Sequence, residues 1–375
     1  MTPTLDIIRT GEAWAELQRE WEELYRSSNP RNPFLSHDWT EACWSAQKSE
    51  AEPFIAALRD RGRLVALAPL CIEKRAGFRV LRFIADDRSD YLGFPCEAET
   101  AGLERQLLDH VLATNGEWDL AVLRNLTDSY TSLHQTVLPE AFRSHRTEWI
   151  RAPYCTAGDD WESLHKSGPS WFREMRKRSR RFARDGHRVE RFDGSEAIDR
   201  LDDVAEIEAH SWKAREQSMR LQEGEGRELL ERAFETLGTR GEMELRLAFV
   251  DDRAVAFQID FVMSDRIWHY QCAYDERFRH TRAGSILTYE ALREAWERGV
   301  REFDYLSGEE PYKLERTNGS RTIHHLAAHR RSARGWLAYG LLVAPQWRLR
   351  NIPAVRTAYK AARALKRRLR PQSNA

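Results

Sequence analysis

The sequence predicts a mixed α/β protein that is built from two similar units. Amphipathic helical segments alternate with short β segments, and the order of helices, β meander, helix and strand occurs twice. The 375 residues also exceed the roughly 250 that one hydrophobic core usually organises. We therefore expect tandem units over residues 1–165 and 166–345, each a mixed, mostly antiparallel sheet flanked by helices, and a basic amphipathic tail over residues 346–375.

The first unit opens with an extended segment and two helices. Apolar residues recur every three or four positions from Glu12 to Tyr25, which predicts an amphipathic helix. Prolines after it end the helix, and Ser36 or Asp38 can cap the next one. The remaining expected elements are β segments at Pro53 to Leu58, Leu64 to Ile72 and Phe78 to Ile84, a helix at Gly102 to Thr114 and a strand at Trp118 to Leu123.

A seam at about residues 151–170 separates the units, because Pro153, Gly158 and Gly168-Pro169 interrupt any periodicity there. Short polar turns then mark a three-stranded meander, and small residues at Ala283-Gly284-Ser285 open a helix that Gly299 closes. The expected elements are a helix at Ile198 to Glu216, a segment Gly224 to Leu237, strands at Met243 to Val250, Ala254 to Met263 and Arg266 to Tyr274, and a strand at Val300 to Leu306.

Composition excludes wholesale disorder and a membrane-spanning chain. Hydrophobic residues make up 41% and charged residues 31%, with a mean hydropathy of -0.67. The longest weakly polar stretch, Gly335 to Trp347, is short of the roughly 20 residues that a spanning helix requires, and no secretory signal is recognisable. We expect a cytoplasmic protein.

Cysteine and histidine patterns predict neither a disulfide framework nor a metal site. The five cysteines are widely spaced, and no motif places a His or Asn partner for Cys272, so we expect Cys272 to be a small buried side chain on a central strand. His324-His325 and His329 have no carboxylate nearby in sequence and do not match a metal-binding pattern.

A strand, a loop and a helix N-terminus follow one another from Cys272 to Ser285. This arrangement offers backbone N–H groups and the positive end of a helix dipole to an anion. Basic residues crowd the loop, and small residues at the start of the helix let phosphate oxygens approach the backbone. The basic residues are Arg277, Arg279, His280 and Arg282.

Three segments of the second half belong together: Trp268 to Asp275, Ala283 to Leu287, and Phe303-Asp304-Tyr305-Leu306-Ser307-Gly308-Glu309-Glu310-Pro311-Tyr312-Lys313. In this order they resemble the GNAT acyltransferase superfamily. More narrowly, they resemble the branch named after the cellulose-biosynthesis protein CelD and described as BioF2-like acetyltransferase. That branch is related to the FemAB peptidyltransferases and has two GNAT-like units. The resemblance is strongest over about residues 165–330, and Asn32 to Ser36 and Asp90 to Phe94 resemble the first unit's matching segments. Arg279 and Gly284 fill the first and last positions of the superfamily's phosphate loop, with Arg282 where its first Gly would stand.

This resemblance implies that acetyl-CoA or another acyl-CoA lies between two splayed strands. The pantetheine would run along Gln271, Cys272, Ala273 and Tyr274, and the pyrophosphate would bind where the helix begins. The resemblance implies a pyrophosphate site formed by Arg279, His280, Arg282, Ala283, Gly284 and Ser285. An amine or hydroxyl of a small-molecule or glycan acceptor would attack the thioester, and cell-surface polysaccharide or envelope metabolism is the implied setting.

Such a reaction needs a base and a proton donor. We expect Glu309, Asp304 or Asp275 to act as the base or to orient the substrate, and Tyr305 or Tyr312 to donate the proton. Lys313 could pair with an anionic group of the substrate.

Two basic segments leave alternatives open. Residues 171–188 could form a helix that joins the units, or could bind phosphates of a tRNA-borne donor as basic helices of FemAB-type enzymes do. Residues 316–375 carry 14 Lys or Arg and no acidic residue, so the tail could contact an anionic membrane peripherally or pack on the acidic body. The function alternatives are a FemAB-like aminoacyl-tRNA-dependent transferase and a non-catalytic scaffold.

Overall fold

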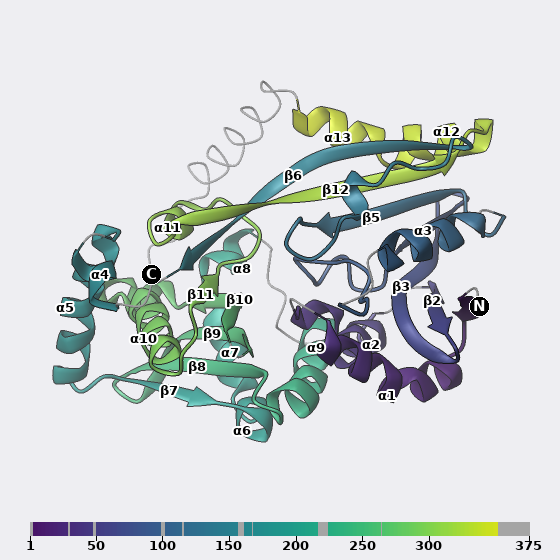
Figure 1. The fold of residues 1–375 in the computed structure, drawn as a ribbon. Coiled ribbons are helices and arrows are strands. Elements are labelled where there is room, and N and C mark those ends of the chain that lie inside the picture. Colours follow the sequence, from purple (N-terminus) through teal and green to yellow (C-terminus); the bar gives the residue numbers. More distant parts are fainter. Residues whose placement is uncertain are drawn as a thin grey trace.

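The strands of both halves join into one twelve-stranded sheet in the computed structural model, with helices on its faces (Figure 1). The structure describes residues 3–28, 31–47, 50–98, 102–114, 116–156, 161–166, 168–216, 224–263 and 265–351. A mixed α/β chain with a mostly antiparallel sheet flanked by helices was predicted, and this is confirmed. The sheet runs without a break from one half into the other.

The first half contributes β1 (Thr4–Ile8), α1 (Gly11–Ser27), α2 (His37–Ser45), β2 (Glu52–Asp60), β3 (Arg63–Arg75), β4 (Phe78–Phe83), α3 (Leu103–Ala113), β5 (Leu120–Leu126) and β6 (Phe142–Thr156). The second half contributes α4 (Trp161–Lys166), α5 (Ser170–Arg184), β7 (Arg188–Phe192), α6 (Gly194–Ile198), α7 (Leu201–Ala209), α8 (Trp212–Glu216), α9 (Glu225–Ala233), β8 (Met243–Val250), β9 (Arg253–Met263), β10 (Arg266–Tyr274), α10 (Ala283–Glu297), β11 (Glu302–Asp304), α11 (Pro311–Leu314), β12 (Gly319–Arg330), α12 (Ala333–Leu342) and α13 (Ala344–Asn351).

Each half repeats one strand pattern. Strands β1 to β4 pair antiparallel in chain order and β4 pairs parallel with β5, while β7 to β10 and β11 do the same in the second half. The parallel pairs need a crossover connection, and helices α3 and α10 supply it. The shared pattern agrees with the expected duplication.

The last strand of each half pairs with the other half. The sheet order is β1-β2-β3-β4-β5-β12-β6-β11-β10-β9-β8-β7. Strand β12 therefore lies between β5 and β6, and β6 lies between β12 and β11. Figure 1 shows β6 and β12 as two long strands side by side, with α12 and α13 along them. The two halves thus complete each other's sheet.

The expected seam at residues 151–170 falls partly on β6. Pro153 lies inside this strand opposite Ser320, and its carbonyl accepts a hydrogen bond from the Tyr305 N–H at 3.0 Å. Gly158 lies outside the described residues. The division into residues 1–165, 166–345 and 346–375 stays a prediction, and residues 352–375 of the tail lie outside the described part.

Several element boundaries differ from the prediction for local reasons. The expected helix at Ile198 to Glu216 is three short helices, α6, α7 and α8. Helix α5 ends at Arg184 because Gly186 adopts a left-handed conformation at φ 86°, after which β7 begins. Strand β11 is confined to Glu302–Asp304, since Leu306 also lies at positive φ.

Apolar side chains from both halves form one large core between the sheet and its helices. Phe34 and Trp39 of the first half contact Phe261 of β9, with ring centroids 5.2 and 5.0 Å apart. Burying aromatic rings against each other stabilises this junction. In the described part of the chain, no helix is both long and apolar enough to cross a membrane.

Candidate functional site

Strands β10 and β11 diverge after only three paired residues. Arg266 to Trp268 pair with Glu302 to Asp304, and beyond this point β10 continues along β9 to Tyr274. The chain after β11 instead follows β6, since the N–H groups of Tyr305 and Gly308 donate to carbonyls of Pro153 and Arg151. The two strands therefore splay apart, as the resemblance implied.

A β-bulge in β10 determines which of its side chains lie on the same face of the sheet where β10 and β11 diverge. Side chains alternate along an unbroken strand, so His269 and Cys272, three residues apart, would face opposite sides. The register shifts between His269 and Gln271, so that His269 lies opposite Asp260 and Cys272 opposite Gln258. Because Gln258 and Asp260 are two residues apart on β9, all four side chains lie on one face of the sheet.

His269 is held in place by a buried carboxylate. Its Nδ1 lies 2.9 Å from the Asp260 Oδ1, and the other oxygen of Asp260 accepts a hydrogen bond of 2.6 Å from the Gln258 amide. The His269 side chain is only 2% exposed, and its Nε2 makes no hydrogen bond with a described residue. Burial lowers the pKa of His269, but the Cys272 thiolate and Asp260 outweigh this and raise it to about 9.

Cys272 lies in a positively charged environment. Burial raises the pKa of its thiol, but the positive charge of His269, followed by those of Lys213 and Lys313, outweighs burial and lowers the pKa to about 7. Cys272 is partly exposed, unlike the fully buried Cys43, Cys71 and Cys155. No sequence motif placed an imidazole near this thiol, and the bulge brings the charge of His269 to it.

Three further predicted residues gather at the splay. The Tyr305 ring lies 5.6 Å from the His269 ring, and burial raises the pKa of its phenol. Burial and the neighbouring Cys272 thiolate raise the pKa of Tyr312 well above its ordinary value. Lys313 donates a hydrogen bond of 2.7 Å to the Ser307 carbonyl and pairs with Glu310. Both phenols therefore keep their protons at neutral pH.

The edge of β10 leads to the first turn of α10. Gln271 accepts a hydrogen bond of 2.9 Å from Lys213 of α8, and Ala273 is buried in the core. A Cβ added at Gly284 would lie 3.4 Å from the Tyr274 side chain, so Tyr274 covers the start of the helix. Arg282 precedes the helix in a left-handed conformation at φ 59°, and Ala283 is buried.

The loop before α10 is basic and open to solvent. Arg279, His280 and Arg282 are exposed on the 3-10 helix Glu276–Thr281 and just after it. They are placed to contact a solvent-borne anion that approaches the first turn of α10.

Arg316 adds a buried cation at the same turn, and the sequence did not single it out. Its Nη2 donates a hydrogen bond of 3.0 Å to Ser285 Oγ, and its guanidinium lies over the rings of Trp171 and Tyr312. Arg316 is 7% exposed, its Nε has no hydrogen-bond partner, and it forms no ion pair within the described residues. A buried guanidinium without a carboxylate favours an anionic ligand at this turn.

Two of the three predicted acids, Asp304 and Asp275, are held by structural contacts instead. Asp304 accepts hydrogen bonds from Tyr91 at 2.8 Å and from Arg321 at 2.8 Å, and burial raises its pKa to about 6 despite Arg321. Asp275 caps the loop by accepting from the Arg277 N–H, and although burial opposes this, Arg277 holds the pKa of Asp275 below its ordinary value. Glu309 is exposed on the loop before α11.

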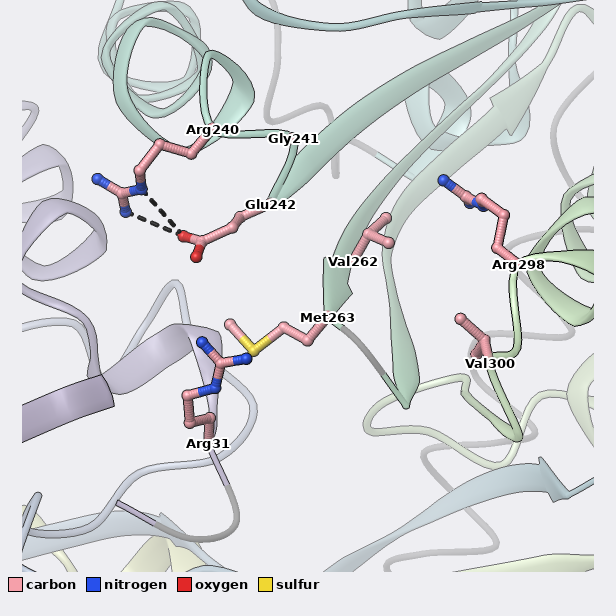
Figure 2. A pocket seen from close by; sticks show the side chains of 8 residues that line it. All are labelled: Arg31, Arg240, Gly241, Glu242, Val262, Met263, Arg298 and Val300. Carbon is pink, nitrogen blue, oxygen red and sulfur yellow. Dashed lines mark hydrogen bonds and ion pairs between the residues drawn. The ribbon is translucent and has the colours of Figure 1, made fainter. Parts of the chain in front are cut away.

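The pocket in Figure 2 lies away from the first turn of α10. It is found where β9 ends and where the chain leaves the C-terminal end of α10, whereas the candidate site lies at the helix's first turn. Two of its three arginines are paired: Arg240 with Glu242 at 3.0 Å and Arg298 with Glu244 at 3.3 Å. The lining residues are Arg31, Arg240, Gly241, Glu242, Val262, Met263, Arg298 and Val300.

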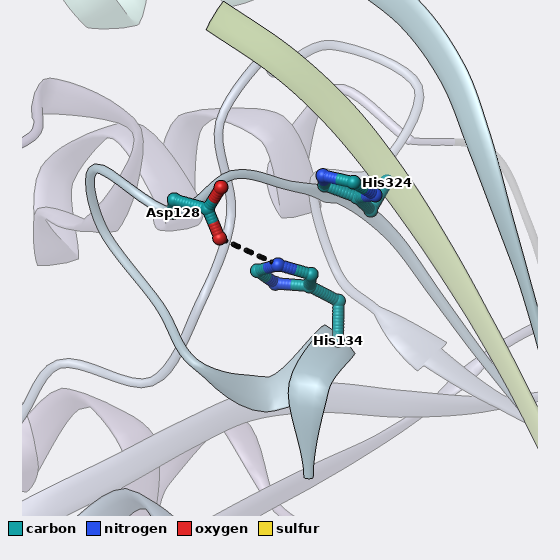
Figure 3. A group of neighbouring side chains, drawn as sticks. All are labelled: Asp128, His134 and His324. Carbon is teal, nitrogen blue, oxygen red and sulfur yellow. Dashed lines mark ion pairs between the residues drawn. The ribbon is translucent and has the colours of Figure 1, made fainter.

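Asp128, His134 and His324 come within 4.8 Å of one another through their ligating atoms (Figure 3). The His134 Nε2 lies 2.7 Å from Asp128, and the two imidazoles stack with centroids 4.2 Å apart and planes 9° apart. Ring nitrogens bind a metal in the plane of the ring, so these near-parallel rings would have to turn to share an ion. That this protein holds no metal stays a prediction.

Comparisons with known proteins agree with this fold. Residues 170–314 match a family model described as an acetyltransferase (GNAT) domain. No curated protein sequence matches the chain. FemX, at 13% identity, superposes with a TM-score of 0.61 over 87% of this chain and 98% of FemX.

Two other solved structures share the fold. A conserved protein of unknown function from Bacteroides thetaiotaomicron has 14% identity and a TM-score of 0.56, over 87% of this chain and all of that one. The C-terminal domain of a putative lysylphosphatidylglycerol synthetase from Agrobacterium fabrum has 12% identity and a TM-score of 0.56, over 87% and 96%. Residues 170–314 are thus similar to a GNAT acetyltransferase domain, and most of the chain shares its fold with these proteins.

Proposed function

We propose that this protein transfers an acetyl or other acyl group from acyl-CoA to an amine or hydroxyl, because residues 170–314 match a GNAT acetyltransferase domain. The thioester lies in the splay between β10 and β11, and the first half of the chain shapes the acceptor site. The CelD or BioF2-like branch, with a small-molecule or glycan acceptor of the cell envelope and a cytoplasmic location, belongs to this proposal.

The observation that carries it is the buried guanidinium of Arg316 at the first turn of α10. A pyrophosphate bound there would receive the positive end of the helix dipole, the exposed cations of the loop and the uncompensated charge of Arg316. The thioester end would then extend along Gln271 to Tyr274 toward Cys272 and Tyr312.

A titration of the full chain with acetyl-CoA and with CoA, followed by calorimetry, tests the donor site. We expect micromolar binding that Gly284→Glu weakens by about a hundredfold or more, since the added carboxylate repels the pyrophosphate. Gly284→Ala is the matched control, because its Cβ meets Tyr274 only at an ordinary contact distance of 3.4 Å. Arg316→Gln should also weaken binding while circular dichroism shows an unchanged fold.

The second candidate is transfer of an aminoacyl group from a charged tRNA, which the resemblance to FemAB peptidyltransferases implies. Helix α5 buries Trp171, Phe172, Met175 and Phe182 and leaves a strongly basic face exposed. Lys177 and Arg180 on this face are exposed. Such a surface can follow a phosphate backbone.

Binding measurements with both kinds of donor on the same purified protein distinguish the acyl-CoA candidate from the tRNA candidate. No binding of either CoA compound, together with salt-dependent aminoacyl-tRNA binding that Lys177→Glu and Arg180→Glu remove, would replace acyl-CoA by tRNA as the donor. If neither ligand binds the folded chain, a non-catalytic scaffold is the better description. Peripheral contact of the tail with an anionic membrane stays a prediction, because residues 352–375 lie outside the described structure.

A further inference from the structure

We propose that Cys272 is a covalent nucleophile, which takes the acyl group onto its Sγ as a thioester before an acceptor receives it. This inference rests on the proposed acyl-CoA function and deepens it. Among the described residues, Cys272, His269 and Asp260 form a thiol, imidazole and carboxylate in series on one face of β9 and β10.

The first support is the imidazole. His269 Nε2 is buried, has no hydrogen-bond partner in the described chain and belongs to a side chain that is 2% exposed. An unsatisfied buried nitrogen is costly, and a role in proton transfer is one physical reason for a protein to keep it. Asp260, held by Gln258, fixes the ring through Nδ1 and leaves Nε2 for the thiol.

The position of Cys272 along β10 also fits a nucleophile. Cys272 lies two residues before Tyr274, whose side chain covers Gly284 at the start of α10. A donor with its pyrophosphate at this turn would direct its thioester back along β10 to the splay. Cys272 is partly exposed there, and Tyr312 lies beside its sulfur.

The charges around the thiol favour its reactive form. Burial disfavours the thiolate, but His269 first and then Lys213 and Lys313 lower the pKa of Cys272 to about 7. The thiolate is the nucleophilic form of cysteine, so a large fraction is available at neutral pH.

Acyl transfer through Cys272 needs no reactant besides acyl-CoA and the acceptor. The Cys272 thiolate attacks the thioester carbonyl, a new C–S bond forms and the bond to CoA sulfur breaks. The CoA thiolate takes the proton of the His269 imidazolium and leaves as a thiol. The neutral imidazole then accepts the proton of the acceptor's amine or hydroxyl as that group attacks, and the Cys272 thiolate is released, which restores the starting pair.

The test incubates the full chain with acetyl-CoA in the absence of an acceptor and measures its intact mass. We expect one added acetyl group on the peptide that carries Cys272, removable by hydroxylamine. Cys272→Ser should abolish the label, and His269→Gln should slow its formation by about a hundredfold, the usual size of a general acid–base contribution. Cys96→Ser is the matched control, since Cys96 is also partly exposed but lies outside the splay, and it should label normally.

A second measurement follows alkylation of Cys272 by iodoacetamide against pH. We expect half-maximal reactivity near pH 7, moving up toward the ordinary thiol value of about 8.5 in His269→Gln. A midpoint near 8.5 in the unmodified protein would mean that His269 does not activate the thiol, and would overturn the inference.

The outcomes separate the two proposals. Acetyl-CoA binding without acetylation of Cys272, or turnover that survives in Cys272→Ser, would overturn the covalent step and leave the acyltransferase proposal standing. A failure of acetyl-CoA to bind would overturn both.

Discussion

At the scale of single residues, Asp304 ties the two halves together. It is fully buried on β11 and accepts hydrogen bonds from Tyr91 of the first half and from Arg321 of β12. Arg321 also pairs with Glu302 at 2.6 Å. Removing one partner of such a network leaves an uncompensated buried charge, which is far more costly than the pair is stabilising. Asp304 therefore acts as a structural residue in this arrangement.

We expect Asp304→Ala to lower the free energy of unfolding by about 3 kcal/mol, because Arg321 loses a buried partner and Tyr91 loses its acceptor. Tyr91→Phe removes only one hydrogen bond to a charged group and should cost about 1.5 kcal/mol. Urea denaturation of both variants measures the difference. Equal unfolding midpoints for Asp304→Ala and the unmodified protein would show that the network contributes nothing to stability.

At the scale of elements, stacked aromatic and histidine rings pack α12 against strands β6 and β12. The His145 ring lies 3.5 Å from the Tyr339 ring and 5.4 Å from the His329 ring, while Arg143 lies over Trp336. Burial first and the neighbouring His329 second lower the pKa of His145 to about 4, and burial also lowers the pKa of His329. Both shifts favour the neutral imidazoles in the folded chain.

Acid should therefore loosen this element. The pKa of His145 is lower in the folded chain than its ordinary 6.5, so the unfolded chain binds more protons between about pH 4 and 6.5. The stabilising contribution is complete above pH 6.5 and is lost as the pH falls through 4. His145→Phe keeps a ring on Tyr339 and should reduce the loss of urea midpoint between pH 7 and 5. His280→Gln, in an exposed loop, should leave that loss unchanged; equal losses in all three proteins would contradict this assignment.

At the scale of the whole molecule, the exchange of β6 and β12 makes the two halves one folding unit. Strand β12 pairs with β6 over its whole length and with β5 from His324 to Ala328, and β6 also pairs with β11. Either half alone would leave long strand edges unpaired, and such edges favour aggregation. The aromatic junction between Phe34, Trp39 and Phe261 adds apolar surface that separation would expose.

We expect residues 1–160 and 161–375 to fail to fold when each is produced alone, and to form a folded complex when produced together. Near-UV circular dichroism and cooperative urea unfolding of each fragment and of the pair provide the measurement. A fragment that unfolds cooperatively by itself would show that the halves are independent domains.

Elements that local rules encode could be predicted from the amino-acid sequence. Period and turn chemistry predicted α1, the meander of β8, β9 and β10, and α10 with Gly299 after it, because apolar spacing and polar turns are local properties. The basic loop and the small residues at Gly284 were visible for the same reason. The resemblance to the GNAT superfamily pointed to the splayed strands before any geometry was known.

Pairings between residues far apart in sequence became visible only in the folded chain. Strands β6 and β12 were not predicted, since their partners lie in opposite halves of the chain and each strand's pattern reflects two different neighbours. The bulge at Tyr270 brings His269 to Cys272, and a register shift cannot be read from one strand without its partner. Likewise Asp304 resembles a base in sequence, but Tyr91 and Arg321 hold it as part of the junction, because burial and long-range hydrogen bonds set the role of a carboxylate.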